Sequence, residues 1–183
     1  MKKWLFLILL FPLICVAQTY RYLGVEDGLS NRRVYCIQKD KTGYMWFLTH
    51  EGIDRYNGKE FKRYKLMDGD AEVNSLLNLN WLYIDQEGVL WEIGKKGKVF
   101  RYDQIHDCFS LVYKLPMESF SEQPDPVTYA WLDQNKHIWL CNKDTIFLYN
   151  TDTKQVTHIK NDISEEITDI EQIDESHFFI GTE

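Results

Sequence analysis

The heptapeptide DKTGYMW, residues 40–46, decides how this chain is to be interpreted, because it recurs. DQEGVLW follows at 85–91 and DQNKHIW at 133–139, so an Asp, a turn and a Trp return at similar intervals. A repeat of roughly 40–50 residues indicates a solenoid, a propeller or an array, and this periodicity outweighs local guesses about any one segment. The heptapeptide therefore belongs to a repeated unit of structure.

Each copy of the repeat divides into four short segments with the pattern of β-strands. Aromatic and β-branched residues alternate with polar ones, and turn-forming residues separate the segments at nearly regular spacing. In the first copy we expect strands near 34–40, 44–49, 53–56 and 60–65. Asn57-Gly58 is expected to form the last hairpin, because this dipeptide is strongly preferred in two-residue turns.

One blade of a β-propeller consists of four antiparallel strands, and propellers typically have about four to eight blades. We therefore predict an all-β protein in which 18–183 forms a partial propeller of about three and a half blades, an incomplete ring. The repeats are expected near 28–66, 72–115 and 124–161, with an incomplete one at 163–183.

The heptapeptide itself is expected to be a tight turn followed by a core residue. Asp40 can bond nearby backbone amides, and Gly43 can take positive φ at the end of the turn. The third copy has Lys136 in place of this Gly and the fourth has no Gly after Asp174, so we expect those two turns to be looser or of another type. The tryptophans at the end of the heptapeptide are predicted to be the repeat core: Trp46, Trp91 and Trp139.

Residues 1–17 have the features of a secretory signal peptide. Two lysines precede the apolar run 4–16, and small residues suit cleavage between Ala17 and Gln18. The run is too short for a membrane span of roughly 30 Å. A lipoprotein anchor on Cys15 is disfavoured because a larger residue precedes it. We expect an exported, periplasmic protein.

Composition and charge exclude several classes of function. The formal net charge is −7 and basic residues are not interleaved with stacking aromatics, which disfavours nucleic acid or an anionic membrane as partner. Cys36, Cys108 and Cys141 remain after cleavage without Cys-x-x-Cys or Cys/His metal spacing, so we expect no metal or cofactor. Cys36 is interpreted as a small buried hydrophobic residue.

Candidate site residues are few. His50-Glu51 resembles the His-acidic pair of a kinase phosphoacceptor, but its surroundings predict a hairpin. Arg32 and Arg33 precede a first strand near the propeller axis, where they could bind an anionic ligand or form a solvated rim. Sugar-stacking aromatics are conceivable at Tyr22, Tyr44 and Tyr129. No catalytic nucleophile or carboxylate pair stands out, although a secreted propeller-fold carbohydrate-active enzyme and a stand-alone interaction module remain alternatives.

The first repeat closely resembles the two-component regulator propeller repeat. The matching residues are Gly28-Leu29-Ser30-Asn31, Ile37, Asp40, Gly43, Trp46, Gly52-Ile53, Arg55-Tyr56 and Asn57-Gly58. The resemblance implies the periplasmic sensor of a hybrid two-component system of the Bacteroidetes type. In that family, propellers and an immunoglobulin-like domain precede a membrane helix, a histidine kinase and a response regulator, and members commonly sense oligosaccharides released from glycans.

This resemblance implies a ligand-sensing segment that is not itself an enzyme. The expected partners are a small-molecule ligand, of the oligosaccharide class, together with the remaining propeller blades and the downstream kinase modules. None of those modules lies within these 183 residues, so we expect a chain truncated before the kinase.

Overall fold

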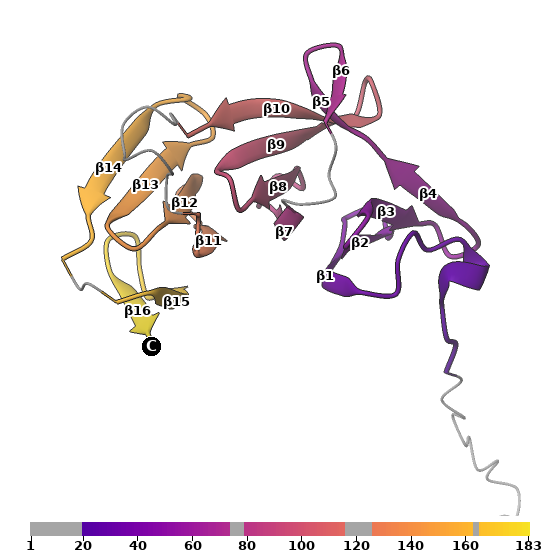
Figure 1. Ribbon diagram of the computed structural model, residues 1–183, viewed down its shortest axis with the longest axis horizontal. Coiled ribbons are helices and arrows are strands. Elements are labelled where there is room, and N and C mark those ends of the chain that lie inside the picture. The colour runs from indigo at the N-terminus through magenta and orange to yellow at the C-terminus, as the bar shows by residue number, and fades with distance from the viewer. Residues whose placement is uncertain (1–19, 74–78, 116–125, 163–164) are drawn as a thin grey trace, which may run out of the picture.

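The computed structural model describes residues 20–73, 79–115, 126–162 and 165–183. Within them, four β-sheets follow one another along an open arc, after a short 3-10 helix η1 (Val25–Asp27) (Figure 1). In this described part, no helix has the length and apolar character that crossing a membrane requires. The expected signal peptide and its cleavage site between Ala17 and Gln18 lie outside the described residues.

The first and third sheets are four-stranded antiparallel blades in simple chain order, as predicted. The first sheet contains β1 (Val34–Lys39), β2 (Met45–Thr49), β3 (Gly52–Tyr56) and β4 (Phe61–Tyr64). The third contains β11 (Tyr129–Leu132), β12 (His137–Cys141), β13 (Thr145–Asn150) and β14 (Val156–Lys160). The fourth has two strands in the described residues, β15 (Ile167–Gln172) and β16 (Phe178–Thr182).

The second sheet has six strands: the four predicted for the repeat and two from a hairpin that the sequence did not predict. Its blade strands are β7 (Leu79–Ile84), β8 (Leu90–Gly94), β9 (Lys98–Asp103) and β10 (Cys108–Lys114). The chain leaving the first blade folds back as the hairpin β5 (Leu66–Asp68) and β6 (Ala71–Val73), and β5 pairs in parallel with β10. This hairpin uses the hydrogen-bonding groups at the outer edge of the sheet, which would otherwise be unpaired.

The sheets are arranged radially. The first strand of each sheet, β1, β7, β11 and β15, lies on the concave side of the arc, and β4, β10 and β14 lie on its outer side (Figure 1). Neighbouring first strands are joined by polar contacts: Gln38 Nε2 donates to the Leu82 carbonyl at 3.0 Å, and the Tyr83 hydroxyl donates to the Ala130 carbonyl at 2.6 Å. The fold class is therefore the predicted propeller-like arrangement, with a ring that is not closed within the described residues.

A separate hydrophobic core fills the space between each pair of neighbouring sheets, and one tryptophan of the repeat lies in each core. Trp46, Trp91 and Trp139 are 1%, 2% and 7% exposed. Large aromatic side chains bury about 150–250 Å² each and dominate the energy of such contacts. The repeat therefore places its largest apolar residue where it joins one sheet to the next.

The third and fourth turns behave differently from each other. Lys136 takes a φ of 65°, and the Asp133 amide donates to the His137 carbonyl at 3.0 Å, as the Asp40 amide does to Tyr44 at 3.0 Å. The prediction of an altered third turn was therefore wrong, because a Lys adopts the left-handed conformation of the missing Gly. In the fourth copy the Ile173 amide likewise donates to the His177 carbonyl at 2.9 Å, but Ile173 replaces the Asp and no described residue of this turn takes positive φ, so that turn is of another type, as predicted.

Glu92, on β8, is an ionisable residue inside the apolar region between the first two sheets. Its cross-strand neighbours are Leu82 and Phe100, it is 0% exposed, and within the described residues neither carboxylate oxygen has a hydrogen-bond partner. Burial raises the pKa of Glu92 well above its ordinary value, because a charged carboxylate without partners is very costly in an apolar medium. Folding thus favours the neutral form of Glu92.

Substituting Glu92→Gln should make the protein less sensitive to rising pH. A pKa raised on folding gives stability that is complete below the unfolded value, about 4.3, and is lost as the pH rises toward the folded pKa. The wild type should lose on the order of 1 kcal/mol of unfolding free energy per pH unit in that interval relative to E92Q. Urea denaturation at pH 5, 6 and 7 measures this difference.

The control is Glu171→Gln, which changes an exposed glutamate of β15. Its unfolding free energy should follow that of the wild type at each pH. An E92Q variant whose advantage does not change between pH 5 and 7 would contradict the protonation of buried Glu92.

Candidate functional site

The aspartate of the heptapeptide joins its turn to the tryptophan of the core. Asp40 Oδ1 accepts hydrogen bonds from the amides of Thr42 and Tyr44 at 2.9 and 3.0 Å. Asp40 Oδ2 accepts the indole N–H of Trp46 at 2.7 Å. The pKa of Asp40 is lowered, because these hydrogen bonds and that of the Thr42 hydroxyl outweigh the opposing effect of burial. One ionised carboxylate thus satisfies both the turn and the buried indole.

The same bond occurs in the next two repeats. Trp91 Nε1 donates to Asp85 Oδ2 at 2.9 Å, and Trp139 Nε1 donates to Asp133 Oδ2 at 2.9 Å. The bonds from Asp to the turn amides were predicted from the sequence, but the indole bond was not. The constant spacing of six residues between Asp and Trp was the signal that could have indicated it.

Substituting Asp40→Ala should cost about 2–3 kcal/mol of unfolding free energy, because it removes charge-assisted hydrogen bonds and leaves a buried indole N–H without its acceptor. Urea denaturation monitored by tryptophan fluorescence measures the loss. The matched control is Asp174→Ala in the fourth turn, where the acceptor bonds are local and Phe179 occupies the tryptophan position. An equal loss in both variants would contradict the role given to the indole bond.

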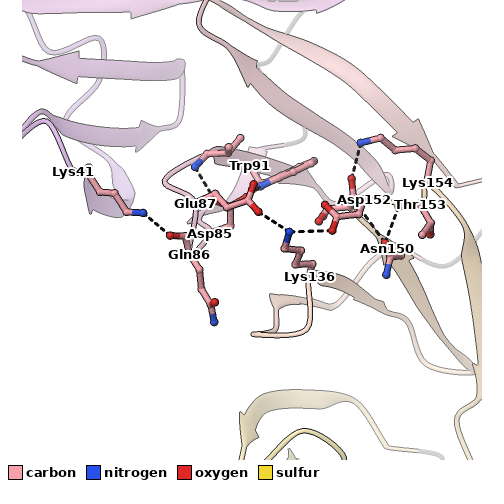
Figure 2. Close-up of polar contacts among 12 residues, drawn as sticks. Lys41, Asp85, Gln86, Glu87, Trp91, Lys136, Asn150, Asp152, Thr153 and Lys154 are labelled. Carbon is pink, nitrogen blue, oxygen red and sulfur yellow. Dashed lines mark hydrogen bonds and ion pairs between the residues drawn. The ribbon is translucent and has the colours of Figure 1, made fainter.

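Polar side chains connect neighbouring turns across one face of the arc (Figure 2). Lys41 of the first turn donates to the Gln86 carbonyl of the second. Lys136 of the third turn reaches back to Glu87 at 2.5 Å and also contacts Asp152 at 2.9 Å. We call this surface the turn face. Its turns are held to one another as well as to their own sheets.

A cleft of about 440 Å³ opens on the turn face between the first and second sheets. Its walls include Tyr44, Trp46 and Arg55 of the first sheet and Arg101 and Tyr102 of the second. We call it the first cleft. Its walls combine aromatic rings with the guanidinium of Arg55, a composition found in sites that bind small polar molecules.

The guanidinium of Arg55 lies among aromatic rings. Its central carbon is 4.5 Å from the ring centroid of Tyr44, 5.2 Å from that of Tyr64 and 5.5 Å from that of Trp46. Arg101 lies 5.9 Å from the ring centroid of Trp91 in the same cross-strand relation to its tryptophan. Cation–π contacts of this kind orient the arginines without neutralising their charge.

The outer edge of the first cleft is closed by a bridge between sheets. Asp107, in the turn between β9 and β10, accepts a hydrogen bond from the Tyr102 hydroxyl at 2.6 Å and pairs with Lys62 of β4. Burial by itself would raise the pKa of Asp107, but the hydrogen bonds from Lys62 and Tyr102 outweigh it and lower the pKa to about 2. Asp107 is therefore charged at any physiological pH.

A second cleft, of about 370 Å³, lies between the second and third sheets and includes Trp91, Arg101, Lys136, Asp152 and Lys154. Here both lysines have partners within the protein. Lys136 pairs with Asp152, and Lys154 Nζ donates to the Thr151 carbonyl at 2.6 Å. Arg101 also lies in this cleft, over the ring of Trp91.

Comparison with known proteins agrees with this geometry. Residues 28–51 match the family model of the two component regulator propeller. The resemblance inferred from the first repeat is thereby confirmed. No protein with a curated description matches the chain.

Solved structures share the fold. The extracellular domain of BT3049 from B. thetaiotaomicron, described as a hybrid two component system, matches 88% of this chain with a TM-score of 0.66 and 26% identity. The extracellular domain of BT4673 from the same organism, also described as a hybrid two component system, matches 91% with a TM-score of 0.65 and 19% identity. The chain covers 24% and 22% of the lengths of those two chains.

The structure explains the start of the matched propeller stretch. Gly28 takes a φ of 106°, Leu29 is buried, and the amide and hydroxyl of Ser30 both donate to Asp54 Oδ2, at 2.8 and 2.5 Å. The Gly-Leu-Ser step thus attaches the entering chain to β3. Sequence reasoning identified this step but did not predict its partner Asp54.

The arginines predicted from the sequence do not line either cleft. Arg32 and Arg33 are exposed, and Arg32 lies 3.8 Å from Glu26. They precede the start of β1, whereas the turn face follows its end, so they lie at the opposite end of the sheet from Arg55. A ligand role for Arg32 and Arg33 remains a prediction.

The other sequence candidates are scattered. Tyr44 lines the first cleft, Tyr22 is 94% exposed, and the Tyr129 hydroxyl donates to Asp169 at 3.1 Å. His50 lies in the predicted turn between β2 and β3 and contacts the Tyr35 hydroxyl at 2.9 Å.

The cysteines Cys36, Cys108 and Cys141 are free, and Cys36 is partly buried beside the first inter-sheet core. Among the residues that the structure describes, no group of three or more His, Cys, Asp or Glu could hold a metal ion.

Proposed function

We propose that this chain is the ligand-sensing propeller segment of an extracytoplasmic sensor of the hybrid two-component type. One observation carries the proposal: the chain combines a two component regulator propeller match at 28–51 with a fold shared over 88% of its length with the BT3049 extracellular domain. The chain covers only 24% of that domain, so the activity of a whole sensor is part of the proposal.

The proposed ligand is an oligosaccharide derived from a glycan. Support comes from the aromatic and polar walls of the first cleft, which suit a ring-shaped polar molecule. Ligand binding would favour one arrangement of propellers over another, since a ligand shifts a conformational equilibrium only through its differential affinity for the two states. Kinase and response-regulator modules outside these 183 residues would convert that shift into phosphorylation. In this proposal the chain itself catalyses no reaction.

A sensor segment should bind a saccharide and leave it intact. We expect at least one member of a panel of neutral and acidic oligosaccharides to raise the midpoint of thermal unfolding of the full chain, because a ligand that binds only the folded state stabilises it. Chromatography of the same mixtures should show the saccharide unchanged. Release of shorter products would instead support a carbohydrate-active enzyme, and no shift with any saccharide would contradict the proposed ligand class.

The proposed location has its own test. Expressed in a Gram-negative host, the protein should be recovered from the periplasm with Gln18 as its first residue, because residues 1–17 have the features of a signal peptide. Intact-mass spectrometry of the periplasmic fraction measures this. The matched control Ala17→Asp places a charge at the cleavage site and should retain the leader. Uncleaved wild-type protein in the cytoplasm would contradict export.

A further inference from the structure

The first and fourth sheets lie at the two ends of the open arc, and within the described residues each packs against one neighbouring sheet (Figure 1). We call the free side of the first sheet the head face; it contains Ile37, Lys39, Phe47, Tyr56 and Phe61. We call the free side of the fourth sheet the tail face; it contains Glu171 and Phe179. We infer that the head face of one copy of this chain binds the tail face of a second copy.

The head face contains an aromatic pair that receives a tryptophan elsewhere in the protein. In the second sheet, Tyr102 and its cross-strand partner Phe109 contact Trp46, with ring centroids 5.1 and 5.9 Å from that of the tryptophan. Tyr56 and its cross-strand partner Phe61 occupy the same repeat positions in the first sheet, and their ring centroids are 4.7 Å apart. Within the described residues neither ring belongs to an inter-sheet core, so the first sheet has the receiving pair without a tryptophan against it.

Other apolar side chains extend the head face. Ile37 is 52% exposed, and its cross-strand neighbour Phe47 is half-buried and lies 5.5 Å from the ring of Phe61. Arg21 of the entering chain covers Tyr56, with its guanidinium carbon 6.0 Å from the ring centroid. A second copy would therefore contact chiefly Ile37, Phe47 and Phe61.

The tail face presents an aromatic ring at the position that the tryptophan occupies in the other sheets. Phe179 lies opposite Glu171 on β15, as Trp46 lies opposite Gln38 on β1. The preceding Phe178 contacts Trp139 of the third sheet, with ring centroids 4.8 Å apart. Because successive side chains of a strand point to opposite sides of the sheet, Phe179 points away from the third sheet, and it is 69% exposed.

Opposite charges favour contact of a head face with a tail face over contact of two like faces. Residues 165–183, which form the fourth sheet, contain seven acidic residues and no lysine or arginine. Residues 20–64, which form the entering chain and the first sheet, contain nine basic and six acidic residues. Lys39 and Glu171 are exposed on the head and tail faces themselves. Such complementarity selects which surfaces pair and makes the association sensitive to salt.

The inferred interface joins two different surfaces, so it is heterologous. Each copy that binds brings a further free face, and association therefore continues beyond the dimer into rings or filaments.

Sedimentation velocity of the purified protein over a range of concentrations tests the inference. We expect the wild type to form species larger than the monomer, and to do so more weakly at high than at low ionic strength. Phe179→Gln and Ile37→Gln should each raise the dissociation constant at least about tenfold, because the interface loses a large apolar side chain. Both side chains are more than half exposed, so neither substitution alters a core.

A mixture of the two variants distinguishes the head-to-tail contact from other kinds of association. Phe179→Gln keeps the head face intact and Ile37→Gln keeps the tail face intact. At concentrations where neither variant associates alone, an equimolar mixture should therefore form a dimer and no larger species.

Ile105→Gln is the matched control, because Ile105 is 89% exposed in the turn between β9 and β10 and lies on neither end face. This variant should associate as the wild type does. A wild type that stays monomeric, or equal association of the wild type and all variants, would overturn the inference. Association of Phe179→Gln alone that is as tight as that of the wild type would also overturn it, because two head faces would then be in contact.

Discussion

The hydrogen bond between a turn carboxylate and an indole N–H six residues later is the interaction on which the rest of the structure depends. It is formed by Asp40 and Trp46, with an N–O distance of 2.7 Å, and repeated in the next two blades. A buried indole N–H needs an acceptor, and a turn aspartate needs donors. One contact satisfies both needs. This hydrogen bond fixes the indole ring that joins one sheet to the next and, at the same time, the turn at the end of the sheet.

The clefts follow from this arrangement. Each tryptophan fills the space between two sheets, and above the first two of these cores the turns form the walls of a cleft on the turn face. In the first cleft, Asp40 accepts the indole N–H of Trp46. Arg55 lies over the rings of Tyr44, Tyr64 and Trp46. The hydrogen bond that orients the tryptophan and the charged side chain that covers it thus share the candidate site.

Sheet interfaces in this protein also contain groups that the repeat pattern does not account for. Glu92 lies between Leu82 and Phe100 in the position that alternation assigns to an apolar residue. The hairpin formed by β5 and β6 adds two strands to the second sheet at its outer edge. Both features depend on contacts between segments far apart along the chain, so a pattern that compares repeats one by one does not reveal them.

By itself, the sequence determined the fold class, the strands of the first blade and the turn after β1, because these depend on local alternation and on the turn chemistry of Asp40 and Gly43. It also indicated the family resemblance, through residues close together in the chain. Only the tertiary structure decided the third turn, where bonds across the sheet hold Lys136 in a left-handed conformation, and the position of the candidate site. Arg55 and Tyr102 lie in different repeats and line one cleft only when two sheets pack together, whereas the adjacent Arg32 and Arg33 were more conspicuous in the sequence and lie elsewhere.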